Sequence, residues 1–233
     1  MYFIFSTCKL YRYNVNHVGC CHWTLLLFVS HGTRAHVFTS HFESSLTPRE
    51  FNSYGARRGN DAVMTRGTFA SIKLLNRFIG KPGPKTLHIP SGQTLDVFEA
   101  ADRYHRDGVP LIILAGKDYG SGNSRDWVAK GPYLLGVRAV IAESFEKLHV
   151  KQLVGVGIVP LQFLPGDSAD SLELSGKERF SVTLPESLSP RQQLTVKTSQ
   201  GKSFLVTALF DTEMDVIFFQ HGGHLRYVAR TFL

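Results

Sequence analysis

The segment Ala115–Trp127, AGKDYGSGNSRDW, contains the residue types of an oxyanion site. Gly120 and Gly122 allow the backbone to turn tightly and to approach a ligand closely. Ser124 can cap a following helix or donate to an oxygen, and Arg125 offers a planar fork of donors that suits a carboxylate or a phosphate. Neither the GK[ST] ending of a P-loop nor the GxGxxG dinucleotide pattern is present. The pattern alone leaves two interpretations open, an anion site or a glycine turn with a capping serine and a surface arginine.

Basic residues are concentrated upstream of this turn. They are Arg57, Arg58, Arg66, Lys73, Arg77, Lys81 and Lys85. Lys73 and Arg77 are four residues apart, so on a helix they would share a face. Next to Arg125, Trp127 could stack on an unpaired base and Asp126 could accept a hydrogen bond from it. The residues alone do not distinguish an RNA-binding surface from a solvated basic face beside a core tryptophan.

The elements that must position these residues alternate between strand and helix. Asn60 and Asp61 can cap a short helical turn. Strands are predicted at 86–89, 109–116, 137–143 and 158–163, and helices at 91–108, 124–135 and 144–157. Further strands are predicted at 180–184, 194–198 and 204–210, and a closing pair of helices at 212–223 and 224–230. This order predicts an α/β fold with a mainly parallel sheet flanked by helices and a C-terminal antiparallel β part.

The predicted fold places the glycine-rich turn where a ligand is expected. Parallel α/β sheets bind ligands beyond the carboxyl ends of their strands. The turn follows the strand 109–116 and leads into a helix near Arg125, whose free N–H groups and dipole favour an anion.

Composition narrows the class of protein without selecting a ligand. The net charge of +7 is compatible with anionic ligands or nucleic acid. All three cysteines, Cys8, Cys20 and Cys21, lie in the first 21 residues, which favours a reducing compartment and leaves the remainder without a thiolate metal site. No apolar run reaches the roughly 18 to 20 residues of a membrane span, so no membrane partner is predicted. The early run WTLLLFV also lacks the flanks of a signal peptide.

A domain boundary is predicted near Ser44–Leu46, where aromatic and histidine-rich sequence gives way to regular periodicity. Residues 1–45 are expected to be an unstructured leader or an artefact of the gene model, and 46–233 a single domain. The early histidines match no zinc template. They are His17, His22, His31, His36 and His41.

Four stretches after this boundary carry long motifs: LTPREFNSYGARRGNDAVMTRGTFASIKLLNRFIG, SGQTLDVFEAA, LIILAGKDYGSGNSRDWVAKGPYLLGVRAV and IVPLQFLPGDSADSL. Together they resemble the C-terminal swivel domain of the aconitase and iron regulatory protein family. The resemblance runs from about Leu46 to Leu233 and implies a swivel-like β/β/α fold. Residues 1–45 resemble nothing in that family.

The resemblance also implies which chemistry is lost. Family enzymes interconvert citrate and isocitrate with a [4Fe–4S] cluster held by cysteines of upstream domains, so this chain is expected to hold no cofactor and no metal. In the family's GxxSSR turn the first serine is the catalytic base, and the following Ser-Arg pair binds substrate carboxylate. Ser124 and Arg125 match that pair, but Asn123 stands at the base position. Ser44 stands near the position of a further substrate arginine. A carboxamide cannot be deprotonated near neutral pH, so no catalytic residue is expected here.

The turn therefore resembles that of the iron regulatory protein without aconitase activity, which binds iron-responsive-element stem-loops in messenger RNA in the cytoplasm. By position, the residues implied for RNA binding are Arg58, Lys73, Arg77, Arg125, Asp126 and Trp127. The resemblance implies that upstream aconitase domains or a large subunit are needed for function.

Two alternatives stay open. The chain could be a hydro-lyase part acting on citrate or isocitrate with a [4Fe–4S] partner domain, similar to the small subunit of isopropylmalate dehydratases. It could also be a fragment that folds but binds little, because the family's site lies between this domain and others.

Overall fold

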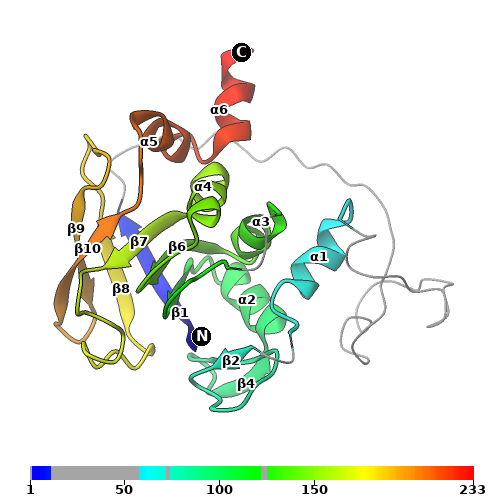
Figure 1. Ribbon diagram of the computed structural model, residues 1–233. Coiled ribbons are helices and arrows are strands. Elements are labelled where there is room, and N and C mark those ends of the chain that lie inside the picture. Colours follow the sequence, from blue (N-terminus) through cyan, green and yellow to red (C-terminus); the bar gives the residue numbers. More distant parts are fainter. Residues whose placement is uncertain (1, 12–57, 72–73, 122–124) are drawn as a thin grey trace, which may run out of the picture.

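The computed structural model describes residues 2–11, 58–71, 74–121 and 125–233 (Figure 1). The strands are β1 (Tyr2–Tyr11), β2 (Leu75–Asn76), β3 (Lys85–His88), β4 (Gln93–Asp96), β5 (Leu111–Ala115), β6 (Val137–Ala142), β7 (Val159–Phe163), β8 (Arg179–Thr183), β9 (Gln193–Thr198) and β10 (Ser203–Ala208). The helices are α1 (Asp61–Gly67), α2 (Val97–Arg106), α3 (Trp127–Leu134), α4 (Lys147–Val156), α5 (Glu213–Gln220) and α6 (His224–Thr231).

The main sheet has eight strands in the order β2-β1-β5-β6-β7-β10-β9-β8. Strands β5, β6 and β7 are parallel, whereas β8, β9 and β10 form an antiparallel meander joined to β7. Strand β1, next to the end strand β2, also pairs with β8, so the sheet curls and β8 closes on β1. The predicted α/β class, with parallel central strands and a C-terminal antiparallel part, is confirmed.

Strand β5 separates two hydrophobic cores. Ile112 and Leu114 pack with residues of the antiparallel meander, including Phe180 and Val196. The alternate residues pack instead with side chains of α2, α3 and α4, and Figure 1 shows α3 and α4 on the side of the sheet opposite the meander. All five residues of β5 are buried. A strand covered on both faces is continuously apolar, which explains why LIILA does not alternate.

One predicted element is wrong around residue 90. The helix expected over 91–108 begins only at Val97, and Gln93–Asp96 instead pairs antiparallel with β3 in a separate two-stranded sheet. The turn between the strands closes with the Gly92 N–H donating to the His88 carbonyl at 2.9 Å. Gly92 has φ of 68°, a left-handed conformation that interrupts a helix.

The expectation of an unstructured leader is wrong for Tyr2–Tyr11, which form β1. This strand pairs antiparallel with β5 and parallel with β8. Its sequence, YFIFSTCKLY, is rich in aromatic and β-branched residues, which favour strands. Residues 12–45 lie outside the described residues.

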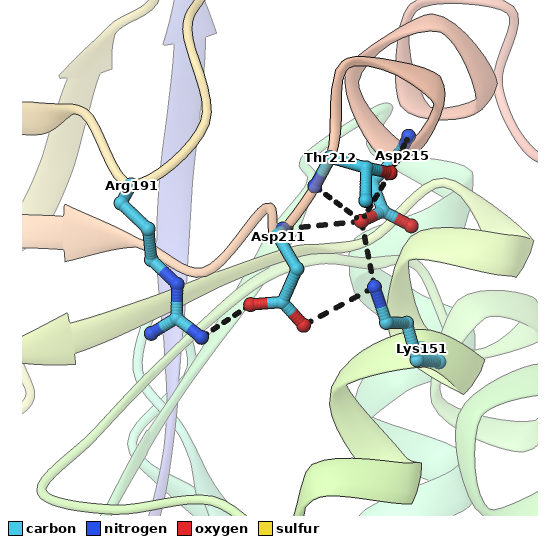
Figure 2. A network of polar contacts seen from close by, with 5 residues as sticks. All are labelled: Lys151, Arg191, Asp211, Thr212 and Asp215. Atoms are coloured by element: carbon cyan, nitrogen blue, oxygen red, sulfur yellow. Dashed lines mark hydrogen bonds and ion pairs between the residues drawn. The ribbon is translucent and has the colours of Figure 1, made fainter.

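A polar network fastens the C-terminal helices to the sheet (Figure 2). The Lys151 ammonium of α4 lies 2.7 Å from Asp215 Oδ2 and 3.1 Å from Asp211 Oδ2. Asp211 also pairs with Arg191. Asp215 and Thr212 form a reciprocal capping box at the start of α5. The network therefore joins α4, the end of β10 and the start of α5.

Candidate nucleic-acid interface

The first half of the glycine-rich turn is fastened to the segment between β6 and α4. The Tyr119 N–H donates to the Ser144 carbonyl at 2.9 Å, and the Glu146 N–H donates to the Tyr119 carbonyl at 3.0 Å. The Asp118 N–H donates to Ser144 Oγ at 2.7 Å. Because both the N–H and the carbonyl of Tyr119 are hydrogen-bonded, the first half of the turn has a defined position.

His149 of α4 forms the floor under Gly120. Gly120 has φ of 89°, and a Cβ atom added there would lie 2.2 Å from His149 Cγ. The imidazole is 1% exposed, and its Nδ1 lies 3.2 Å from Gln152 Oε1. Burial lowers the pKa of His149, although the hydrogen bond to Gln152 and the Glu146 charge act against it. The turn thus rests on a neutral ring that leaves room only for glycine.

The centre of the turn lies outside the described residues. This segment, 122–124, includes Asn123 and Ser124, so the loss of the base and the vestigial carboxylate-binding role of Ser124 stay predictions. Lys73 also lies outside the described residues.

The described chain resumes at Arg125 and Asp126, both exposed at the start of α3. The helix begins at Trp127, three residues later than the predicted start at Ser124. The Arg125 carbonyl accepts from the Val128 N–H at 3.3 Å, a bond three residues long, so a tighter turn precedes the α-helix. Asp126 makes no side-chain cap, which leaves its carboxylate facing solvent.

Trp127 links this helix start to a distant part of the chain. Its indole N–H donates to the Arg58 carbonyl at 3.1 Å across 69 residues of sequence. The side chain is 9% exposed, and the Lys130 ammonium lies 4.5 Å from the ring centroid. The structure therefore gives Trp127 a packing role that holds Arg58 beside the start of α3. A contact of Trp127 with RNA stays a prediction.

Replacing Trp127 by phenylalanine is expected to lower the free energy of unfolding by about 1 kcal/mol, because the Arg58 carbonyl loses its indole donor while an aromatic ring remains. Thermal unfolding of the two proteins measures the change. Tyr133→Phe, on the same helix, keeps its ring and removes no hydrogen bond to another segment, so it serves as the control. An unchanged unfolding midpoint for Trp127→Phe would show that Arg58 is held by other contacts.

Arg77 lies in a turn, not on a helix. The Phe78 N–H donates to Asn76 Oδ1 at 3.0 Å, and the N–H groups of Ile79 and Gly80 both donate to the Asn76 carbonyl. The prediction that Lys73 and Arg77 share a helix face is therefore wrong, because the asparagine side chain closes the backbone into a turn. Arg77 pairs with Asp170 and remains partly exposed.

The structure brings Arg58, Arg125 and Asp126 to one place around Trp127. Arg77 lies instead in the turn after Asn76, where it pairs with Asp170. Two residues at the site were not predicted, Lys130 and His149. Lys130 could have been found from its spacing of three residues from Trp127 on a helix, whereas nothing in the sequence connects His149 with Gly120.

The described residues do not fit an iron–sulfur cluster. Such clusters are held by cysteine thiolates, and no group of three His, Cys, Asp or Glu side chains suited to a metal ion occurs in the described part of the chain. Within the same part, none of the helices has the length and apolar character needed to cross a membrane.

Comparisons with known proteins identify the domain. Iron-responsive element-binding protein 2 of Xenopus laevis is 63% identical over 191 residues, which are 82% of this chain and 20% of that protein. The protein of the same name from Xenopus tropicalis has the same identity and coverage. The chain thus spans about a fifth of the length of the curated relatives it matches.

Among solved structures, a 3-isopropylmalate dehydratase from Methanocaldococcus jannaschii is similar with a TM-score of 0.39 and 19% identity, covering 61% of this chain and 82% of that one. Residues 39–166 match the family described as the aconitase C-terminal domain. The chain belongs to the aconitase C-terminal domain family.

Proposed function

We propose that this chain is the swivel domain of an iron regulatory protein and contributes to binding iron-responsive-element stem-loops of messenger RNA in the cytoplasm. The observation that carries the proposal is its 63% identity over 191 residues with iron-responsive element-binding protein 2 of Xenopus. The domain acts together with the upstream domains that such longer relatives possess, and it is not catalytic alone.

The geometry at the start of α3 supports binding to RNA. Arg58, Arg125 and Asp126 are exposed; the Arg58 carbonyl accepts from the Trp127 indole, and Arg125 and Asp126 directly precede Trp127 in the chain. Arginines suit phosphate oxygens, and a carboxylate can accept from the amino group of a base turned out of its stack. Proteins recognise RNA loops and bulges through such unstacked bases and phosphates. The site therefore has donors for the RNA backbone and an acceptor for a base.

The residue at position 123 supports binding over catalysis. An asparagine amide has no titratable proton near neutral pH and cannot remove a proton from citrate. The [4Fe–4S] cluster of the catalytic family members would belong to upstream domains, because the described residues contain no group of three side chains suited to hold a metal.

The test is a gel shift with a chimera in which residues 46–233 replace the matching region of the Xenopus laevis protein. The chimera is expected to bind an iron-responsive stem-loop with an affinity that falls as salt rises. Arg125→Ala is expected to weaken binding by about tenfold or more, because an exposed guanidinium that contacts RNA contributes roughly 1 to 3 kcal/mol.

Lys197→Ala is the matched control, since Lys197 is exposed on β9 in the antiparallel meander, away from α3. A chimera that fails to bind while the parent Xenopus protein binds would overturn the proposal. Citrate turnover by the chimera with Asn123 in place would favour a hydro-lyase instead, and Asn123→Ser shows whether the serine is what such turnover lacks.

A further inference from the structure

We propose that Lys130 is a further RNA-binding residue, which donates to a phosphate next to the base bound at the start of α3. The proposal rests on the proposed RNA-binding function and adds a residue to the same site.

Lys130 is held at the site by an aromatic surface with a defined position. Its ammonium lies 4.5 Å from the centroid of the Trp127 ring, and its backbone N–H donates to the Asp126 carbonyl at 2.9 Å. The ring is itself held by the Arg58 carbonyl. Because Lys130 is exposed, the attraction of its ammonium to the ring is weak, enough to orient a flexible side chain but not to occupy its donors.

The donors of Lys130 have no acidic partner in the described part of the chain. Asp126 precedes Lys130 by four residues, the spacing and order that favour an ion pair on a helix. No such pair forms, and none of the ion pairs among described residues includes Lys130. The indole faces the ammonium instead, and an aromatic face accepts none of its three N–H groups in a conventional hydrogen bond. The Asp126 carboxylate and the Lys130 ammonium therefore both remain available to a ligand.

The surrounding charges favour a phosphate as that ligand. Arg125 precedes Trp127 by two residues, and the Arg58 carbonyl accepts from the Trp127 indole, so the backbones of two exposed arginines lie close to the residue that Lys130 contacts. A polyanion that releases counterions on binding suits such a group, and a lysine can reach a phosphate as a mobile point charge.

The alternative is that the lysine stem only covers the tryptophan ring. Lys130→Met separates the two roles, because methionine keeps an apolar stem over the indole and removes the charge. Lys130→Arg keeps both the cover and the charge.

In the Xenopus chimera, Lys130→Met is expected to weaken stem-loop binding by about 5- to 20-fold. It should also reduce the slope of log affinity against log salt by about 0.7–0.9, the change expected for one phosphate contact. Lys130→Arg should keep most of the stem-loop affinity and most of the salt slope. The unfolding midpoint should stay unchanged for either variant. Lys197→Met on β9 is the matched control and should alter neither affinity nor slope by a comparable amount.

Two outcomes separate this inference from the proposed function. If Arg125→Ala weakens binding but Lys130→Met leaves affinity and salt slope unchanged, the Lys130 side chain only covers the Trp127 ring. The RNA-binding function then stands. If Lys130→Met weakens binding but leaves the slope of log affinity against log salt unchanged, Lys130 makes no phosphate contact, and the RNA-binding function again stands. If the chimera binds no stem-loop while the parent does, both proposals fall.

Discussion

Gly120→Ala is expected to lower the free energy of unfolding by about 2–5 kcal/mol. A left-handed backbone costs a non-glycine residue about 1–2 kcal/mol, and overpacking a tight site costs a further 1–3 kcal/mol. Both apply here, because Gly120 has φ of 89° and its new Cβ would lie 2.2 Å from the buried His149 ring. Urea denaturation of the 233-residue chain measures the loss.

The double variant Gly120→Ala, His149→Ala tests how much of that loss comes from the imidazole. Removing the ring relieves the contacts at 2.2 and 2.3 Å but leaves the contact with the Cβ of residue 149 at 2.5 Å and the backbone strain. The double variant should therefore be more stable than the sum of the single losses by at least about 1 kcal/mol. The matched control is Gly155→Ala in α4, where a new Cβ meets nothing within 4 Å. That variant should gain up to about 1 kcal/mol, because alanine is the better helix former. Additive losses in the double variant would show that His149 does not form the floor of the turn.

The same collision should affect RNA binding, because the only ways to relieve it are to move the turn or α4. In the Xenopus chimera, Gly120→Ala is therefore expected to weaken binding of the stem-loop, whereas Gly155→Ala should not. Unchanged affinity would mean that the position of the first half of the glycine-rich turn does not control the RNA-binding residues that follow it in the chain.

Most helices and strands could be predicted from the sequence, because capping residues, glycines and apolar runs mark them within a few residues. Asn60 caps α1, accepting from the Val63 N–H at 3.1 Å as its side-chain type predicted. Gly157 ends α4 with φ of 85°. The all-apolar LIILA run predicted a buried strand, and the structure covers it on both faces.

The errors arose where tertiary pairing or a side chain competed with helix periodicity. The segment Gln93–Asp96 fits the start of an amphipathic helix, but Gly92 turns the chain back so that it pairs with β3. Asn76 replaces a helical turn with its own hydrogen bond to the Phe78 N–H. Strand β1 is positioned by pairing with β2, β5 and β8, and the last two lie more than 100 residues away, so no local pattern predicts these pairings.

Part of the site was predicted from residue types and part could not be. The types of Arg125 and Asp126 indicated anion and base contacts, and both are exposed at the start of α3. The bond from Trp127 to the Arg58 carbonyl joins residues 69 positions apart, and the position of His149 under Gly120 depends on how α4 packs. Such contacts follow from the packing of helices on the sheet and not from any periodicity in the chain.

Asp215→Ala is expected to lower the free energy of unfolding by about 2–3 kcal/mol, because it combines the loss of a helix cap with the loss of hydrogen bonds to two backbone N–H groups and to the Lys151 ammonium. Asp215 is 8% exposed, and its Oδ2 accepts from the Thr212 N–H at 2.9 Å and the Asp211 N–H at 3.1 Å. Lys151 keeps its second partner, Asp211, which limits the loss. Glu213→Ala is the matched control: this exposed carboxylate in the same first turn contributes only through the helix dipole, roughly 0.3–1 kcal/mol.

The destabilisation caused by Asp215→Ala should become smaller as the pH falls. Burial opposes ionisation of Asp215, but the hydrogen bonds from Lys151 and Thr212 outweigh it and lower the pKa of this carboxyl below its ordinary 3.8. As the pH falls, the unfolded chain takes up this proton first, so the contribution of Asp215 is complete above about pH 5 and is lost below pH 4, as the pH falls through the folded-state value. Urea denaturation from pH 7 to pH 3 should therefore show the native chain losing its advantage over Asp215→Ala at the acid end. A difference that stays constant down to pH 3 would mean that the charge of Asp215 contributes nothing and that the network of Figure 2 acts through its neutral hydrogen bonds alone.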